Sequence, residues 1–344
     1  MGLFSRLKSA NTLGADNVVT GWASPWSPGQ LAAVNMLGLD VEGLPPSRGD
    51  GMRIAAFAGA RNLLCEGLAL GTLEAYRGDV LLPTQPAWLY RTDSDVHPSS
   101  RLLWTYDDLL WFGRALWSVA RTSSNAIADA VRVPIETWHV NADGKVVVTI
   151  DGQDVEPDPS EILYIPGWDE GLLATGRDVI PTGRDINRAV RQRVRTPVPT
   201  TVIDDQETGR TPDEATALVE QYVDTRRNDS NGAVVYSPPG VKLEEFGKTD
   251  PGLYENARNA TTLDAARLTG VPASLLEGSG VAASLNYKSS LEDRSVLNDL
   301  YRRRARALEA RLSMDDVTPR GTRIALNLTA ITGPNQPLPT PTED

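Results

Sequence analysis

The chain has 344 residues, of which 40% are hydrophobic and 23% are charged, and its formal net charge is −11. The apolar share is enough for a sizeable core divided among two or three folding units. The acidic balance argues against a protein that coats DNA with a basic surface, because phosphate-binding proteins normally carry net positive charge. The single cysteine, Cys65, excludes a disulfide within the chain, and its apolar surroundings predict a buried side chain.

The beginning of the chain shows no targeting or membrane signal. The sequence contains no run of about 18 apolar residues, so it predicts no membrane span. The first residues also lack the apolar region and cleavage site of a signal peptide. Arg6 also departs from the myristoylation pattern. Residues 1–50 are rich in Gly, Pro, Ser and Asn, and they include Trp22 and Trp26. We expect an arm with little regular structure that docks through its tryptophans.

The first half of the chain predicts two helices followed by antiparallel strands. The helices are expected at 53–70 and, with Thr105 as the N-cap, at 107–120. The expected strands cover 72–77, 131–140, 145–150 and 161–166. Asp-Gly pairs at 143–144 and 151–152 predict tight turns within this block.

The second half predicts a small α/β unit between longer helices. A helix at 181–195 should end at the Thr-Pro-Val-Pro sequence of 196–199. The Thr211-Pro212-Asp213-Glu214 sequence is typical of a helix start, and that helix should continue to about 227. Further helices are expected at 253–268 and 289–312, and strands at 200–203, 233–236, 241–246 and 323–328. The proline-rich tail after Gly333 is predicted to be disordered.

No common catalytic or metal-binding motif occurs in the sequence, so we expect no catalytic residue, no metal and no cofactor. The two histidines, His97 and His139, belong to no zinc-binding pattern, and no phosphate-binding P-loop or nucleophile elbow is present. The Gly-rich stretch 278–283 only faintly resembles a dinucleotide loop, because no strand precedes it. Three acid pairs are expected to cap helices or face solvent: 107–108, 204–205 and 315–316.

The stretch 268–278, Leu-Thr-Gly-Val-Pro-Ala-Ser-Leu-Leu-Glu-Gly, resembles a hallmark of tailed-bacteriophage portal proteins of the long-tailed siphophage type. In that family a helix ends in a Gly-Val-Pro-Pro-x-Leu-Leu-Gly stretch. A loop rich in Gly and Ser follows, and then a long helix. Here the loop 279–284 is followed by Asn286-Tyr287 and a helix expected from Ser289. Taken alone, Val271-Pro272 is equally consistent with a simple helix stop, since the residue before proline disfavours the α region.

Other segments resemble the family in the same order along the chain. Residues 133–138 are similar to a segment in which proline introduces a strand, and 158–165 to an Asp-Ile-Leu-His-Ile strand. Residues 171–189 are similar to a Gly-Leu entry into a helix. The order of elements agrees from about 53 to 328, although no long helical crown follows. Three positions depart from the family pattern: Tyr164 for a usual His, Ala273 for a common second Pro, and Glu277 within Leu-Leu-Gly.

The resemblance implies an α+β fold with a mixed α/β wing, a helical stem, a small α/β clip and a channel loop, assembled as a ring. On this chain, the implied parts are an N-terminal arm at 1–50, the first part of the wing at 51–180, stem helices at 181–195 and 253–270, the clip at 196–252, the channel loop at 271–288, a long helix and wing strand at 289–330, and a disordered tail at 331–344.

The resemblance also implies a function without catalysis. Twelve copies would form a homo-oligomeric ring through which double-stranded DNA passes during packaging and ejection. The implied partners are the major capsid protein, the terminase large subunit and the head-tail connector. The expected location is the capsid vertex of the virion, and the host cytoplasm during assembly. Two other classes stay open, namely another virion ring protein, such as a head-tail connector or baseplate component, and an enzyme with an unrecognised site.

Two sets of residues are candidates for the function. The channel loop is expected to be mobile, because small side chains and glycines permit unusual backbone angles; its residues are Gly278, Ser279, Gly280, Val281, Ala282, Ala283 and Ser284. The second set is a basic stripe on one face of the helix after Pro181, at Arg184, Arg188, Arg191 and Arg195. The stripe could face solvent, DNA phosphates or acidic protein partners. We favour protein partners, because arginines that bind DNA would retard its sliding.

The predicted clip strands are short and few. A sheet of two or three such strands has little stability of its own. We therefore expect the clip to pair strands between subunits, which would cover the open strand edges.

Overall fold

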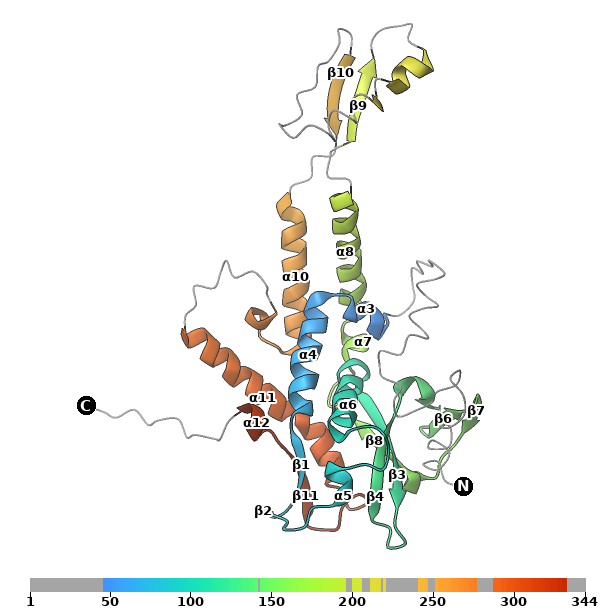
Figure 1. The fold of residues 1–344 in the computed structure, drawn as a ribbon, viewed down its shortest axis with the longest axis vertical. Helices are drawn as coiled ribbons and strands as arrows, with labels where there is room; N and C mark the ends of the chain where they lie inside the picture. The colour runs from blue at the N-terminus through green and yellow to red at the C-terminus, as the bar shows by residue number, and fades with distance from the viewer. Residues whose placement is uncertain are drawn as a thin grey trace, which may run out of the picture. The chain divides into compact units, whose positions relative to one another are not determined.

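The structure, a computed structural model (Figure 1), describes residues 46–141, 143–195, 200–205, 211–217, 219–220, 241–246, 251–276 and 287–332. The chain forms two units. The second unit comprises residues 185–258, and the first unit contains the segments before and after it. The expectations for the N-terminal arm, for 233–236 and for the tail concern residues outside the described part.

Two helices, α4 (Ala55–Ala69) and α6 (Pro98–Phe112), pack against each other in the first unit. Helix α4 buries Phe57 and Leu64 on one face, as its apolar spacing predicts. Helix α6 has proline at its first turn, where no N–H is needed. The Ser99 N–H donates to His97 Nδ1 over 3.2 Å and so caps this helix start.

The helix predicted at 107–120 is wrong in both boundaries. Helix α6 begins at Pro98 and ends at Phe112, and β3 (Arg114–Arg121) replaces its predicted second half. Gly113 separates the two elements with φ 66°, a left-handed conformation that ends helices. The apolar residues on both sides of this glycine fit a helical spacing, which is why the spacing alone misled the prediction.

Four antiparallel sheets are found in the described residues. The first places β1 (Thr72–Arg77) between β11 (Thr322–Asn327) and β2 (Val80–Leu81). The second places β3 between β4 (Ile127–Val133) and β8 (Ile162–Pro166). The third is β5 (Trp138–Val140), β6 (Val146–Ile150) and β7 (Gln153–Val155). The fourth lies in the second unit.

The strand predicted at 131–140 is instead two strands in different sheets. Pro134 cannot donate a ladder hydrogen bond, and a 3-10 turn, η1 (Ile135–Thr137), follows it before β5. The predicted turns at 143–144 and 151–152 are present. Gly144 has φ 77°, and Asp151 and Gly152 both have positive φ, as tight hairpins require.

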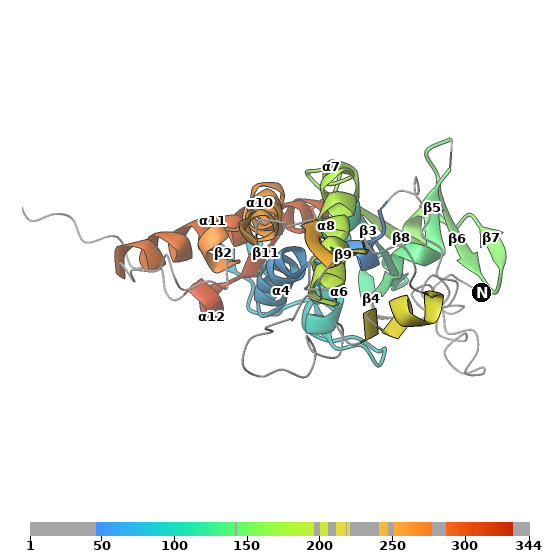
Figure 2. The ribbon, with the colours of Figure 1, turned by 90° about the horizontal axis from the view of Figure 1, so that it is seen from above.

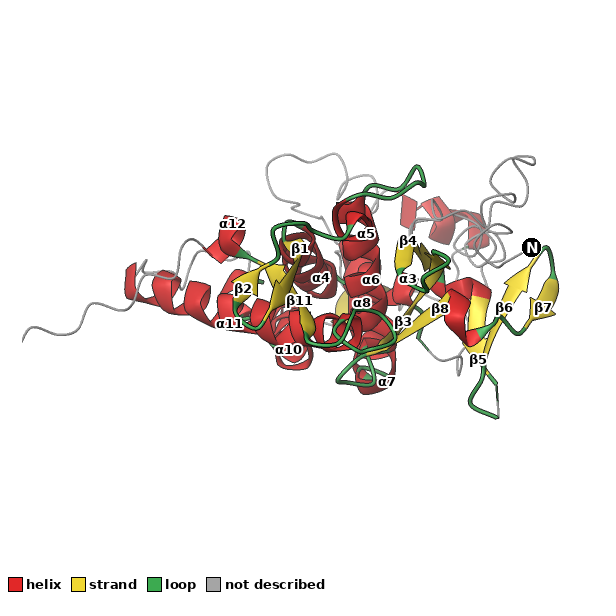
Figure 3. Cartoon of the chain, turned by 90° about the horizontal axis from the view of Figure 1, so that it is seen from below, coloured by secondary structure: helices red, strands yellow, loops and turns green. Residues whose placement is uncertain are grey.

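The main core lies where α4, α6 and α11 (Tyr287–Leu312) meet the first two sheets. Figures 2 and 3, which view the chain from opposite ends, both place α4 and α6 between the β1 sheet and the β3 sheet. The largest fully buried apolar side chains of the main core include Trp111, Trp117 and Leu308. A smaller core joins the β3 and β5 sheets, and is formed by Leu116, Val133, Ile135, Trp138, Val148 and Ile150.

Short elements connect these layers. They are α3 (Arg48–Met52), α5 (Ala87–Tyr90), η2 (Pro159–Glu161), α7 (Leu172–Thr175), η3 (Ala273–Leu275) and α12 (Thr329–Thr332). Tyr164, which stands where the resemblance leads one to expect His, packs edge-on against Trp138 with ring centroids 6.0 Å apart. The tyrosine therefore helps to join the two sheets of the smaller core.

The acid pair at 107–108 is buried, which contradicts the expectation that it caps a helix or faces solvent. The Asp107 side chain is 0% exposed and lies 2.6 Å from Arg61 Nε and 2.7 Å from Arg48 Nε. Asp108 accepts two hydrogen bonds from Arg132, at 2.6 and 2.7 Å. Burial raises the pKa of Asp108 to about 7, more than the charge of Arg132 lowers it. By contrast, the Asp315–Asp316 pair lies exposed, as expected.

Two long helices each belong partly to the first unit. These are α8 (Val179–Arg195), whose first turns belong to that unit, and α10 (Pro251–Thr269), whose last turns do. A side chain at Gly183 of α8 would lie 2.9 Å from both Ile54 and Thr261. Glycine thus allows α8 to approach α10 and the segment before α4 closely. The helices predicted at 181–195, 253–268 and 289–312 are all present, with starts two residues earlier than predicted.

The second unit holds a two-stranded antiparallel sheet of β9 (Thr200–Asp205) and β10 (Val241–Phe246). Residues 212–217 and 219–220 are helical, and the Glu214 carboxylate accepts from the Thr211 N–H over 2.8 Å, as the predicted cap requires. Within the described residues the sheet has two strands, so its pairing with another subunit stays a prediction.

Candidate functional site

The predicted basic stripe lies on α8, and the structure describes the side chains of three of its four arginines. Arg184 is one-third exposed, and its Nη1 lies 3.5 Å from Asp50 Oδ1 of the same chain. Burial by itself would raise the pKa of Asp50, but hydrogen bonds from Ser47 and the charge of Arg184 hold that pKa below its ordinary value. Arg184 therefore already has an acidic partner within its own subunit.

The next two arginines of the face project toward solvent. Arg188 and Arg191 are exposed, and Arg191 Nε donates to the Asn187 carbonyl over 3.4 Å. The Arg195 side chain lies outside the described residues. Arg188 and Arg191 thus place two exposed cations on consecutive helical turns, and the binding role of the stripe remains a prediction.

The predicted channel loop, 278–284, lies outside the described residues, but the structure describes the elements on both sides of it. Helix α10 ends at Thr269, and Gly270 follows with φ 77°. Val271 is 1% exposed and anchors the chain in the main core. The chain re-enters the described part in α11 at Tyr287, so the loop is attached to two long helices.

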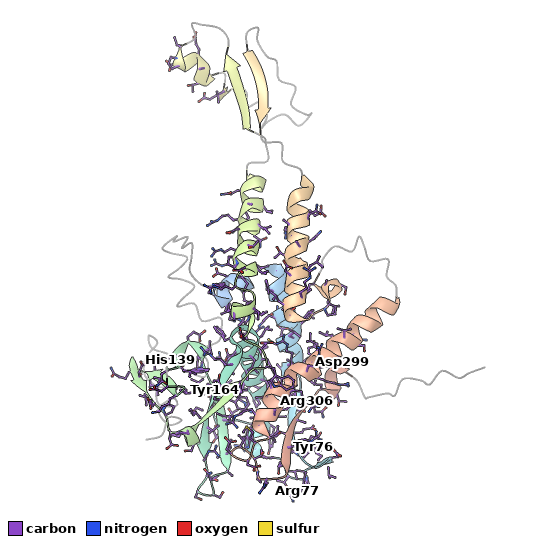
Figure 4. The ribbon with its side chains drawn as sticks, turned by 180° about the vertical axis from the view of Figure 1, so that it is seen from behind. Tyr76, Arg77, His139, Tyr164, Asp299 and Arg306 are labelled. Carbon is purple, nitrogen blue, oxygen red and sulfur yellow. The ribbon has the colours of Figure 1, made fainter. Side chains whose placement is uncertain are left out.

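A second basic surface, which the sequence reasoning missed, lies on α11. It forms a shallow hollow of about 490 Å³ lined by Val296, Asp299, Arg302, Arg303 and Arg306. Figure 4 labels Asp299 and Arg306 on this helix. The consecutive arginines 302–304 were a visible signal in the sequence. Two ion pairs along the helix hold part of this charge, because Arg302 lies 3.8 Å from Asp299 and Arg306 lies 3.7 Å from Glu309.

No cluster in the described residues has the composition of a catalytic or metal site. They contain no group of three or more His, Cys, Asp or Glu side chains that could hold a metal ion. His97 caps α6, and His139 lies exposed on β5 (Figure 4). None of the helices that the structure describes is long and apolar enough to cross a membrane.

Comparison with solved structures identifies the fold. The chain is similar to an HK97-family phage portal protein from Corynebacterium diphtheriae, with a TM-score of 0.64 and 25% sequence identity. The match covers 86% of this chain and 99% of that chain. Searches of family models and of curated proteins gave no match.

Structures of gene transfer agent (GTA) particles show the same fold. The neck of an empty particle contains a chain that matches with a TM-score of 0.60 and 15% identity, over 87% of this chain and 89% of that one. A chain in the virion of the native particle matches with a TM-score of 0.59 and the same identity and coverage.

These matches confirm two predictions made from the sequence, the resemblance to phage portal proteins and the α+β portal fold. The prediction that the chain is not an enzyme is also confirmed by the match, because portal proteins are structural proteins without enzymatic activity.

Proposed function

We propose that this chain is a phage-type portal protein, and that copies of it form a ring that passes double-stranded DNA through the vertex of a virion head. The observation that supports this most is the match to the HK97-family portal protein, which spans 99% of that chain. A fold shared over nearly the whole length of a portal protein supports the same kind of assembly for this chain.

We propose that the ring has twelve copies and that the loop 278–284 lines its channel. The two helices on either side of the loop would fix its position, and its small residues would let it adapt to moving DNA. The net charge of −11 is consistent with this role. A channel that carries few cations grips phosphates weakly and lets DNA slide.

The partners in this proposal are the major capsid protein, the terminase large subunit during packaging, and the head-tail connector afterwards. The location would be the portal vertex of the virion, and the host cytoplasm during assembly. Support comes from the GTA particles, in whose neck and virion chains of the same fold are found. The two exposed arginines of α8 are assigned to protein partners in this scheme, since an acidic chain supplies many acidic neighbours.

The test is the assembly state of the purified chain, viewed end-on by electron microscopy. The proposal predicts closed rings of twelve copies with a central pore wide enough for duplex DNA. A stable monomer or dimer at all concentrations would contradict it. Binding of the terminase large subunit to the rings separates a portal from a connector or baseplate ring, which would form rings without binding the motor.

A further inference from the structure

A cavity of about 300 Å³ in the first unit has no role in the proposed channel. It lies between α4, α6, the end of α10 and α11. Its floor is apolar, and is formed by Leu64, Leu68, Leu109, Leu110, Leu268 and Leu300. This volume is at the lower end of the range of about 300–1,000 Å³ that is common for ligand pockets. The cavity therefore fits one large side chain or a small molecule.

One polar atom in the cavity wall lacks a partner. Tyr106 is 3% exposed, and its hydroxyl makes no hydrogen bond within the described residues. A buried hydroxyl without a partner costs about 1–3 kcal/mol, and such groups are uncommon in folded proteins. An occupant that brings a polar atom together with an apolar body would satisfy this hydroxyl.

One of the residues that line the cavity is an aromatic side chain exposed to solvent. Trp168 lines the cavity and is 69% exposed. Its loop is fixed, because the Gly167 N–H donates to the Gly113 carbonyl over 2.8 Å and the Gly171 N–H donates to Asp169 Oδ1 over 3.1 Å. Exposed tryptophans on a fixed backbone are frequent anchors of binding sites.

The cavity wall is also positively charged. Arg267, Arg303 and Arg304 line it, and Asp169 is the one acidic residue in the lining. Arg304 pairs with Asp169, and Arg267 lies 2.8 Å from Asp264. Arg303 has no ion pair among the described residues. The lining therefore favours an acidic occupant.

A segment of the same chain matches these features. Residues 9–45 contain Asp16, Asp40 and Glu42 but no Lys or Arg, and they include Trp22 and Trp26. An indole ring supplies a large apolar body and one N–H donor, which an unpartnered tyrosine oxygen can accept.

The segment is also within reach of the cavity. Arg48, close to the point where the described chain begins, binds Asp107, the residue after Tyr106 in α6. The roughly 20 residues from Trp26 to this point could span about 65 Å when extended, several times the diameter of a helix.

We propose that the Trp22–Trp26 stretch of the N-terminal arm docks into this cavity of its own chain. One tryptophan enters the apolar floor and donates its indole N–H to Tyr106, the other packs on Trp168, and the acidic residues of the arm lie near Arg303. This inference does not depend on ring formation or on DNA passage, so it stands or falls separately from the proposed function.

The test places a photo-crosslinking amino acid at Ser24, between the two tryptophans, in the full-length chain. The expected crosslinks, located by mass spectrometry, join position 24 to residues 167–170 or 300–307. In a mixture of isotopically labelled and unlabelled chains, the two peptides of each crosslink should both be labelled or both be unlabelled, because they come from one chain. The same amino acid at Asn11 is the control and should give no crosslink to the cavity.

Two sets of variants sharpen the test. Trp22→Ala with Trp26→Ala should remove the cavity crosslink, and Arg303→Glu should lower its yield severalfold. Arg320→Glu makes the same charge change on a side chain that is 93% exposed, and should leave the yield unchanged. Crosslinks mainly to other sites or to a second chain would overturn the proposal. A cavity crosslink that persists in the double tryptophan variant would do so as well.

Discussion

Asp107 is a buried carboxylate that pairs with two buried arginines in the first unit. Its two oxygens accept hydrogen bonds from Arg48 in α3 and Arg61 in α4, and its side chain has no exposed area. Two neighbouring helices therefore meet a third one, 46 or more residues further along the chain, at one carboxylate. Because two guanidinium groups share it, removing its charge would leave two cations in a site with little water.

We predict that Asp107→Asn lowers the free energy of unfolding by about 3–5 kcal/mol, the usual cost of breaking a buried ion pair. The matched control is Asp315→Asn, which alters an exposed acid whose carboxylate lies 4.0 Å from Arg320. We expect that variant to change stability by less than about 1 kcal/mol. Urea unfolding followed by circular dichroism measures both. Equal effects of the two substitutions would contradict the buried role of Asp107.

Cys65 should be chemically inert in the folded chain although it lines a cavity. Its side chain is 1% exposed, and burial, with a further contribution from the charge of Asp107, raises the pKa of the thiol well above its ordinary value. Because the thiolate is the reactive form, we predict negligible alkylation by iodoacetamide at pH 8 in the native protein. Mass spectrometry should show complete alkylation in guanidinium chloride. Rapid labelling of the native chain would show that the thiol is accessible and ionised.

At the scale of the element, the junction between α6 and β3 depends on Gly113. Its φ of 66° is unfavourable for other residues, and a side chain there would collide with the backbone of Asp169 and Glu170. The junction also fixes the loop that carries Trp168, because the Gly113 carbonyl accepts from Gly167 N–H. One glycine therefore ends a helix, starts a strand and positions a loop.

We predict that Gly113→Ala destabilises the chain by more than 2 kcal/mol. The left-handed conformation alone costs a non-glycine residue about 1–2 kcal/mol, and the backbone collision adds to this. Gly144→Ala is the control, since Gly144 has φ 77° and open space around it, and should cost about 1–2 kcal/mol. Thermal unfolding of both variants tests the difference. If the two substitutions were equally costly, the packing of the loop against Gly113 would have no energetic weight.

The elements that the sequence predicted well are those whose signals are local. Helix α11 and strand β1 follow from apolar periodicity, and the hairpin at Gly144 follows from its Asp-Gly turn. The division at Gly113 was missed because the apolar spacing continues across it. The buried role of Asp107 could not be predicted, since Arg48 is 59 residues away in sequence. Long-range ion pairs leave no local pattern.

The candidate site was predictable only as a helix face. Spacing alone placed the arginines of α8 on one side, but it could not show that Arg184 would pair with Asp50, 134 residues earlier. The arginines of α11 were equally visible in the sequence, yet nothing local indicated that they would line a hollow and a cavity. Which side chains a fold exposes together depends on tertiary packing.

At the scale of the whole molecule, the exposed arginines of α8 should act in assembly. We predict that Arg188→Glu with Arg191→Glu weakens ring formation or connector docking, because the reversed charges would repel acidic neighbours. Arg91→Glu with Arg320→Glu makes the same total charge change on two exposed side chains and serves as the control. Analytical ultracentrifugation and a connector pull-down measure the two outcomes. Complete rings that dock the connector and differ only in DNA passage would place the arginines in the channel instead.

The shared carboxylate of Asp107 also constrains how this sequence can change over generations. Losing Asp107 alone leaves two buried cations, and losing Arg48 or Arg61 alone removes hydrogen bonds to a carboxylate that has no exposed area, so each single step is costly. Replacing all three with well-packed apolar residues would often be neutral or even stabilising. Sequences in which only one or two of the three residues have been replaced should therefore be less stable than either end point. Lineages that carry this trio should keep it or lose it as a set, with few partial combinations surviving.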